Sequence, residues 1–387
     1  MSAHPYAGLK IVEIADHVGG EYLGRLFAEL GAEVTKLEPP AGSATRHVGP
    51  YAGGAEGPEN SLTFWYYNTN KKSVLVDLAS GDPHAALVPF LADADMLIVT
   101  FQPGVLRQLG LDLDRLSQDF PRLVIVSMTP YGLTGPWADY RSSDLVALAA
   151  GGPLHMCGYD DHSIPPIMPG GPQAHHTTAA FAHIAVMAAL IERQTTGLGQ
   201  LLDVSMHSAS ALNTELGNPF WLYNRVPVLR QTCRHAQPVM TQSPMYECAD
   251  GSYVYYTLIL ADQHSWKILV AWMDELGMAA MLTEPAYGDV LHRQANMGQI
   301  QELVESFFLI QNGHDAYLEG QRRGLPIGIV NAPEELLDDE HLKARGFFVP
   351  VETDTAHGTV LYPGESCRYS AFGAVERRRA PRLGEDG

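Results

Sequence analysis

The pattern that most narrows the possible folds of this chain is an alternation of short apolar strands and helices over its first 130 residues. Strands are expected at residues 10–14, 33–38, 73–77, 96–99 and 123–127. A helical pattern over 21–30 ends at Gly31, a normal helix terminator. Because apolar strands separated by helices are typical of parallel sheets buried on both faces, we expect an α/β, Rossmann-like fold.

The first strand lacks the glycine pattern of dinucleotide-binding proteins. Gly19 and Gly20 are followed by Glu21, so the Gly-x-Gly-x-x-Gly pattern is absent. A dinucleotide site is therefore disfavoured.

The pattern changes in the second half of the chain. Residues 245–256 predict a hairpin with an Asp-Gly turn, and helical patterns follow it. We therefore expect a smaller α+β domain at 226–330, and a large Rossmann-like domain formed by 1–225 and 331–387.

Charge and composition exclude several classes of partner. The chain has 44 acidic and 25 basic residues and a formal net charge of −19, which disfavours binding to nucleic acid or to anionic lipid. The N-terminus has no signal-peptide pattern, and the most apolar helical stretch, 179–191, is shorter than the roughly 20 residues of a membrane span. The four cysteines and the histidines show no metal-ligand spacing. We expect a cytoplasmic protein without a metal or a membrane segment.

Several motifs, in order along nearly the whole chain, resemble one enzyme family. They are LGAEVTKLEPP at 30–40, NTNKKS at 68–73, FQPGVL at 101–106, YGLTGP at 131–136, TGLGQ at 196–200 and ARGFF at 344–348. The chain resembles the class III CoA-transferases, the group named after carnitine dehydratase and the bile-acid-inducible protein F. The resemblance implies an interlocked dimer, in which each chain threads the other, and CoA thioesters as substrates.

The family mechanism implied by the resemblance is covalent. An aspartate attacks the acyl-CoA and forms a mixed anhydride, and the released CoA thiolate then attacks the aspartyl carbonyl, which leaves CoA on the enzyme as a thioester. An acceptor acid reverses the steps. The aspartate belongs to an Asp-x-x-x-Gly pattern ahead of a helix that contains Ala-Ala-Leu, here residues 188–190, and counting back places His175 at its position. A carboxylate can carry CoA as a thioester, whereas an imidazole cannot.

The resemblance also suggests where CoA binds. The residues expected to contact it are His17, Val18, Arg46, Phe101, Gln102, Arg107 and Tyr131. Open α/β sheets bind ligands beyond the ends of their strands, which agrees with His17. Several polar positions of the family are replaced, at Pro39, Ala79, Thr100 and Gln108. The phosphates of CoA need cations or helix N-termini, so these replacements weaken the expected site.

Three functions remain open on the sequence. In the first, the chain is a CoA-transferase subunit that acts on an acyl-CoA and a carboxylic acid. It would work as a homodimer, or as a heterodimer with a related chain that supplies the aspartate. Alternatively, it is an acyl-CoA racemase, isomerase or lyase with His175 as general base. The third possibility is a non-catalytic scaffold.

Individual residues near His175 also have simpler interpretations. His175 could cap the following helix or fill the space of a carboxylate, and Asp144 is expected to cap a helix. Asp160 and Asp161 are expected to be turn residues, with a substitute carboxylate as the alternative. We expect His175 to lie at the mouth of a pocket, beside Tyr131, Gly132 and the loop at 158–162.

Overall fold

A computed structural model describes residues 4–214, 216–258, 260–353, 355 and 357–387. The chain divides into two compact units. The first contains residues 1–154, 169–214 and 340–387, and the second contains 155–168 and 215–339. The second unit therefore includes residues 155–168, 215–225 and 331–339, which the sequence analysis assigned to the large domain.

The first unit is built on a six-stranded parallel sheet, which confirms the expected fold class. The strand order is β3-β2-β1-β4-β5-β6. The strands are β1 (Lys10–Ile14), β2 (Glu33–Glu38), β3 (Lys72–Leu75), β4 (Met96–Val99), β5 (Val124–Thr129) and β6 (Leu201–Ser205). Since β1 and β4 are neighbours in the middle of the sheet, the strand order reverses between them.

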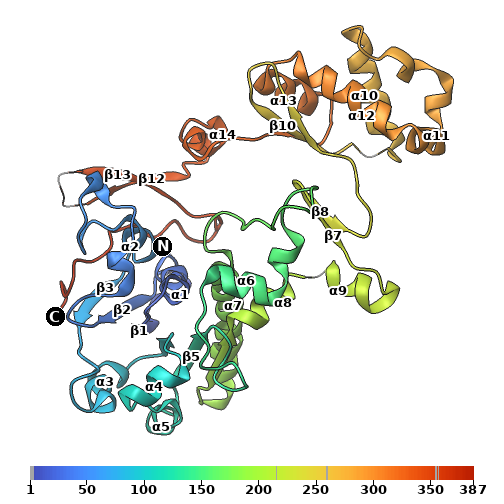
Figure 1. Ribbon diagram of the computed structural model, residues 1–387. Helices are drawn as coiled ribbons and strands as arrows, with labels where there is room; N and C mark the ends of the chain where they lie inside the picture. The colour runs from blue at the N-terminus through green and yellow to red at the C-terminus, as the bar shows by residue number, and fades with distance from the viewer. Residues whose placement is uncertain (1–3, 215, 259, 354, 356) are drawn as a thin grey trace. The chain divides into compact units, whose positions relative to one another are not determined.

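Helices cover both faces of this sheet. On one face, α1 (Val18–Ala28) and α7 (Gln173–Thr196) lie side by side (Figure 1). On the other face lie α3 (Pro83–Leu91), α4 (Pro103–Leu109) and α5 (Leu113–Asp119). Because successive side chains of a strand point to opposite faces, Ile11 packs in the first layer and Val12 in the second. This is why the central strands β1, β4 and β5 carry apolar residues on both faces.

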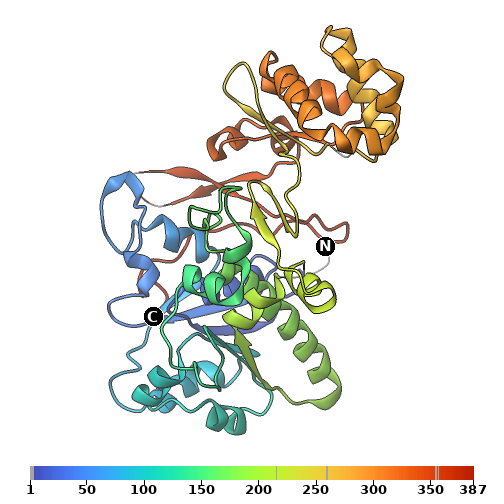
Figure 2. The ribbon, with the colours of Figure 1, turned by 45° about the vertical axis from the view of Figure 1, so that its right-hand side comes forward.

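The C-terminal segment returns to the edge of the sheet. Figure 2 shows it running beside β3, where the amide of Asp386 donates to the carbonyl of Ser73 (2.9 Å) and the amide of Leu75 donates to that of Gly387 (3.0 Å). The first unit also contains the hairpin of β12 (Phe348–Glu352) and β13 (Thr359–Pro363), and four further helices, α2 (Leu62–Tyr67), α6 (Asp144–Gly151), α8 (Met206–Leu212) and α14 (Glu340–Ala344).

A buried ion network ties β1, β2 and α1 together. The Nζ atom of Lys36 lies 3.0 Å from Glu13 Oε1 and 2.9 Å from Glu21 Oε1, and that of Lys71 lies 2.8 Å from Glu13 Oε2. All four side chains are inaccessible to solvent. Burial opposes the charge on Lys36, but Glu21 and Glu13 outweigh this effect and raise its pKa.

The second unit has its own core around a small antiparallel sheet. Its order is β11-β10-β9, with the turn at Asp250 and Gly251 that the sequence predicts, since Gly251 has φ +78°. The strands are β9 (Met245–Glu247), β10 (Tyr253–Tyr256) and β11 (Ile327–Ile329), and a separate hairpin joins β7 (Leu229–Gln231) and β8 (Arg234–Gln237). The helices are α9 (Gly217–Pro219), α10 (Gln263–Glu275), α11 (Val290–Ala295), α12 (Met297–Leu309) and α13 (Gly313–Arg322).

Helix α7 is longer than the apolar stretch expected at 179–191. Its 24 residues are long and apolar enough to cross a membrane, by length and composition alone. The core helix of a globular protein meets the same criterion. Here Ala179, Ala182 and Val186 are buried against α1 and the sheet, so α7 forms part of the core.

Candidate functional site

The first element of the candidate site is a crevice at the carboxyl ends of β1 and β4. In open α/β sheets, ligands bind where the strand order reverses, which is here between these two strands. A cavity of about 260 Å³ opens at this end of the sheet and is lined by Ile14, Asp16, Leu37, Phe101 and other residues. Of the residues expected to contact CoA, Phe101 lines this cavity.

His17 and Val18 lie just beyond β1, after Ala15 and Asp16. His17 is the N-cap of α1, since its Nδ1 accepts from the amide of Gly19 (3.2 Å), and Val18 is the first helical residue. In neutral His17 the ring proton is therefore on Nε2, which is buried and has no hydrogen-bond partner in the described structure. This leaves one imidazole donor free at the start of α1.

His175 packs against this helix start. Its ring centroid lies 4.8 Å from that of His17, and its Nδ1 is buried without a hydrogen-bond partner. A Cβ at position 19 would lie 2.9 Å from this Nδ1 and 2.7 Å from the Cε of Met128, so a glycine is needed there. His175 thus lies in the first turn of α7 and is partly buried where this turn packs against α1.

The environment of His175 keeps its ring neutral. Burial, followed by the proximity of His17 and then of His176, lowers the pKa of His175 to about 3. An imidazole with this pKa is uncharged at neutral pH but is a weak base. Its chemistry is therefore that of a neutral hydrogen-bonding group.

Asp144 belongs to α6, but its side chain caps the start of α7. Its Oδ1 accepts from the amide of His175 (3.0 Å) at the start of α7, whereas the side chain of Ser143 caps α6. The other oxygen, Oδ2, is buried without a hydrogen-bond partner in the described structure. Burial raises the pKa of Asp144, against the opposing effect of the amides at the start of α7. This carboxylate fixes the position of His175.

Tyr131 belongs to an aromatic cluster beyond the ends of β5 and β6. Its ring lies 5.7 Å from the rings of both Trp137 and His207, and 6.4 Å from that of Tyr140. Gln102 supports this loop, since its Nε2 donates to the carbonyl of Tyr140 (2.6 Å). Tyr131 and Gln102 are predicted from the sequence, whereas Trp137 and Tyr140 are not, because aromatic residues in a loop have no periodic pattern.

Two of the expected cations are engaged in ion pairs. Arg46 is fully buried, with Nη2 lying 2.8 Å from Glu38 Oε1 and donating to the carbonyl of Pro381 (3.1 Å), so it does not reach the crevice. Arg107 is exposed and paired with Asp139. Both guanidinium groups are therefore paired with carboxylates of the chain itself, Arg46 in the interior and Arg107 at the surface.

The loop aspartates lie in the second unit and are also engaged. Asp160 pairs with Arg234 through both oxygens (2.9 and 3.0 Å), and Asp161 Oδ1 accepts from the amide of Ser163 (2.8 Å). Both contacts are those of structural turn residues.

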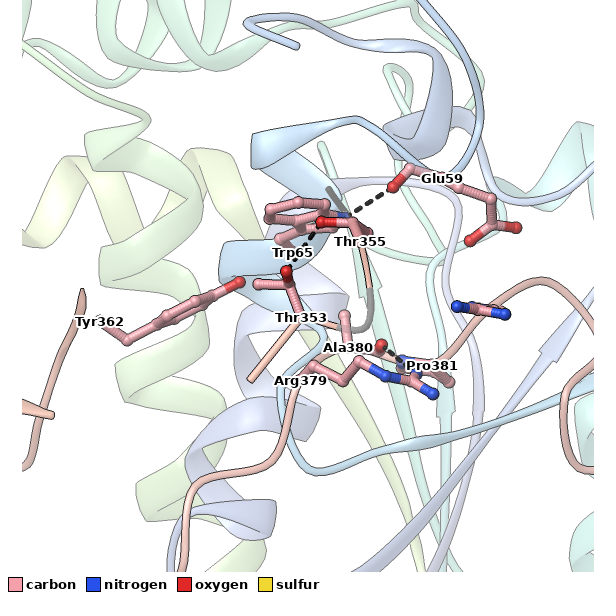
Figure 3. A pocket seen from close by; sticks show the side chains of 9 residues that line it. Glu59, Trp65, Thr353, Thr355, Tyr362, Arg379, Ala380 and Pro381 are labelled. Atoms are coloured by element: carbon pink, nitrogen blue, oxygen red, sulfur yellow. Dashed lines mark hydrogen bonds between the residues drawn. The ribbon is translucent and has the colours of Figure 1, made fainter. Parts of the chain in front are cut away.

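A cavity beside the C-terminal segment is too small for a substrate. Figure 3 shows a cavity of about 30 Å³ lined by Glu59, Trp65, Thr353 and residues of the C-terminal segment. There Trp65 Nε1 donates to the carbonyl of Glu59 (2.8 Å), and the volume suits a water molecule. Among the described residues, no group of three or more His, Cys, Asp or Glu side chains is placed to hold a metal ion.

Comparison with known proteins identifies the family. The profile of CoA-transferase family III matches residues 6–387. The chain therefore belongs to CoA-transferase family III, as its motifs predict.

Three relatives extend this result. The chain is 30% identical over 384 residues to the succinyl-CoA:(R)-benzylsuccinate CoA-transferase subunit BbsE of Thauera aromatica, covering 98% of this chain and 92% of that one. It is 26% identical to the beta subunit of the succinyl-CoA–L-malate CoA-transferase of Chloroflexus aurantiacus, with the same coverage. The crystal structure of a CAIB/BAIF family protein from Brucella suis superposes with a TM-score of 0.85 at 26% identity, covering 99% of this chain and 97% of that one.

Proposed function

We propose that this chain is a subunit of a class III CoA-transferase that binds a CoA thioester of an organic acid but does not itself carry covalent CoA. A related chain supplies the aspartate that does. The proposal goes beyond family membership in two respects, the missing carboxylate and the partner.

The observation that carries the proposal is the placement of His175. It lies in the first turn of α7, against His17 and Gly19, at the position where the family resemblance implies an aspartate. Covalent capture of CoA needs a carbonyl carbon on the side chain, and imidazole has none. Asp144, the carboxylate beside it, is engaged as the cap of α7.

A partner chain is supported by an unpaired apolar stripe on α7. Phe181, Ile184 and Ile191 recur at helical spacing and are 39%, 68% and 62% exposed. Leu212 of α8 is also 63% exposed. Exposed apolar side chains at helical spacing are a feature of protein interfaces. Two of the relatives above are named as subunits, which agrees with an assembly of related chains.

The substrate class follows from the family and stays broad. The relatives are named for succinyl-CoA and for organic acids, namely benzylsuccinate and malate. For this chain we propose a CoA thioester and a carboxylic acid of the same general kind.

The racemase, isomerase or lyase alternative rests on the unpartnered Nδ1 of His175, which is available to accept a proton. The lowered pKa of about 3 argues against it, because a general base works best with a pKa near the operating pH. The CoA-transferase subunit therefore has the better support.

The test is a trapping experiment on the purified chain, alone and co-expressed with an aspartate-bearing relative. Each preparation receives an acyl-CoA and hydroxylamine, which converts an enzyme thioester to a hydroxamate. We expect no modified residue in this chain, and a hydroxamate on the partner's aspartate together with CoA transfer between two acids.

Two variants sharpen this test. His175→Asp should produce a trace of hydroxamate at position 175, whereas His176→Asp, which adds the same carboxylate one residue away, should not. Robust CoA exchange by the unmodified chain alone would sink the proposal, and mapping the adduct would then locate the carboxylate used. Absence of acyl-CoA binding in every assembly would instead support the scaffold alternative.

A further inference from the structure

The cavity in the crevice between β1 and β4, which is also lined by residues that follow β2 and β3, has an unusual charge for a site that takes CoA. Its walls are aliphatic and aromatic side chains, among them Ile14, Leu37, Phe101 and Leu109. Two exposed carboxylates, Asp16 and Asp77, stand on its lining. Of the described residues that line it, none is a lysine or an arginine.

Two neighbouring cations, Lys36 and Arg46, are not available to this cavity. Lys36 is fully buried beneath the crevice, where it binds Glu13 and Glu21 and donates to the carbonyl of Ala15 (3.1 Å). Arg46 is fully buried in its pair with Glu38. Breaking such a pair to reach a ligand would leave a buried charge uncompensated, which is strongly unfavourable.

The nucleotide end of CoA combines two parts with opposite requirements. Its adenine is planar and uncharged, and it suits an apolar crevice with a few polar atoms. Its ribose carries a 3′-phosphate, which needs cations or a cluster of amide donors. The cavity meets the first requirement and opposes the second, because Asp16 and Asp77 repel a phosphate.

We infer that this chain binds the adenine of a CoA thioester in the β1–β4 crevice without recognising the 3′-phosphate, so that CoA and 3′-dephospho-CoA bind with similar affinity. This inference rests on the proposed function, since it assumes that the crevice takes CoA. It concerns the specificity of the nucleotide end, whereas the proposed function concerns the thioester end.

The test compares CoA with 3′-dephospho-CoA by isothermal titration calorimetry on the assembled protein. We expect dissociation constants within about threefold of each other, or a preference for 3′-dephospho-CoA. Tighter binding of CoA by about tenfold or more would overturn the inference and leave the proposed function standing. If neither molecule bound, the proposed function itself would fail, and the inference with it.

Matched variants test the electrostatic cause. Asp77→Asn removes one carboxylate from the lining and should strengthen binding of CoA about threefold relative to 3′-dephospho-CoA. Asp93→Asn makes the same change of charge at an exposed residue just before β4, at the opposite end of the sheet, and should leave the ratio unchanged. High salt should abolish the effect of Asp77→Asn, because it screens exposed charges. An unchanged ratio in Asp77→Asn at low salt would contradict the repulsion on which the inference depends.

Discussion

The close approach of α1 and α7 depends on a single glycine. Gly19 lies where the rings of His17 and His175 and the methyl group of Met128 converge, and a Cβ there would contact all three. The orientation of the two histidines is thus coupled to the absence of one side chain.

We therefore expect Gly19→Ala to displace His175 and to lower the free energy of unfolding by about 1–3 kcal/mol through overpacking. Urea unfolding measures this change. Gly170→Ala is the control, because a Cβ there meets no atom within 4 Å. Equal stability of the two variants would show that the contact at Gly19 relaxes freely.

Lys36 is a second residue on which the stability of the protein should depend. Lys36→Met should destabilise the protein by about 3–5 kcal/mol, because it removes the ion-pair partner of the buried Glu21 and leaves the buried Glu13 paired with Lys71 alone. Lys72→Met removes an exposed pair with Glu33 and should change stability by less than about 1 kcal/mol. Both values come from chemical denaturation at neutral pH. A loss below about 1 kcal/mol in Lys36→Met would mean that water reaches the carboxylates.

Among the helices, α7 has a distinctive row of histidines toward α1. His175 faces His17, His176 accepts or donates a hydrogen bond with the hydroxyl of Tyr67 (2.8 Å), and His183 does so with that of Tyr6 (2.7 Å). Burial lowers the pKa of all three, with His17 and His176 adding to the effect at His175 and Arg25 adding to it at His176. The packing of α7 therefore requires neutral rings.

This requirement predicts a loss of stability in mild acid. The unfolded histidines titrate near pH 6.5 and the folded ones at lower pH, so the unfolded state binds more protons below that value. Stability should be fully present above pH 6.5 and should fall below it, by up to about 1.4 kcal/mol per pH unit for each histidine. Urea unfolding between pH 7 and pH 5 measures the slope. His183→Gln should make the dependence of stability on pH shallower. An identical slope in that variant would contradict a contribution of His183.

For the molecule as a whole, the last residues complete the first unit. The C-terminal segment binds the edge strand β3, and the carbonyl of Pro381 accepts from the buried Arg46. Residues more than 300 positions apart in sequence therefore share one polar layer.

Removal of residues 380–387 should lower the melting temperature by several degrees, because Arg46 loses a buried acceptor and β3 loses its edge hydrogen bonds. Differential scanning calorimetry measures this effect. Asp386→Asn keeps the segment and weakens only the contact of Asp386 with the amide of Ser73 (2.8 Å), so its effect should be smaller. A full-length melting temperature in the truncated protein would show that these contacts are dispensable.

The sequence by itself determined the layered α/β fold and the family. The central strands β1, β4 and β5 could be located because they are buried on both faces and are mainly apolar. Gly31 and the Asp-Gly turn mark local backbone requirements. The motifs from residue 30 to residue 348 predicted CoA-transferase family III, which the match over residues 6–387 confirms. These features are local in sequence, so they can be recognised without knowledge of long-range contacts.

Only the tertiary structure decided which polar residues face a ligand and which face one another. Arg46 was expected to contact CoA but is buried against Glu38 and the C-terminal segment, and Asp144 caps α7 although it belongs to α6. The acidic lining of the crevice, from Asp16 and Asp77, likewise depends on two loops that follow different strands. The role of a charged side chain depends on its nearest opposite charge and on its burial, and both are set by residues distant in sequence.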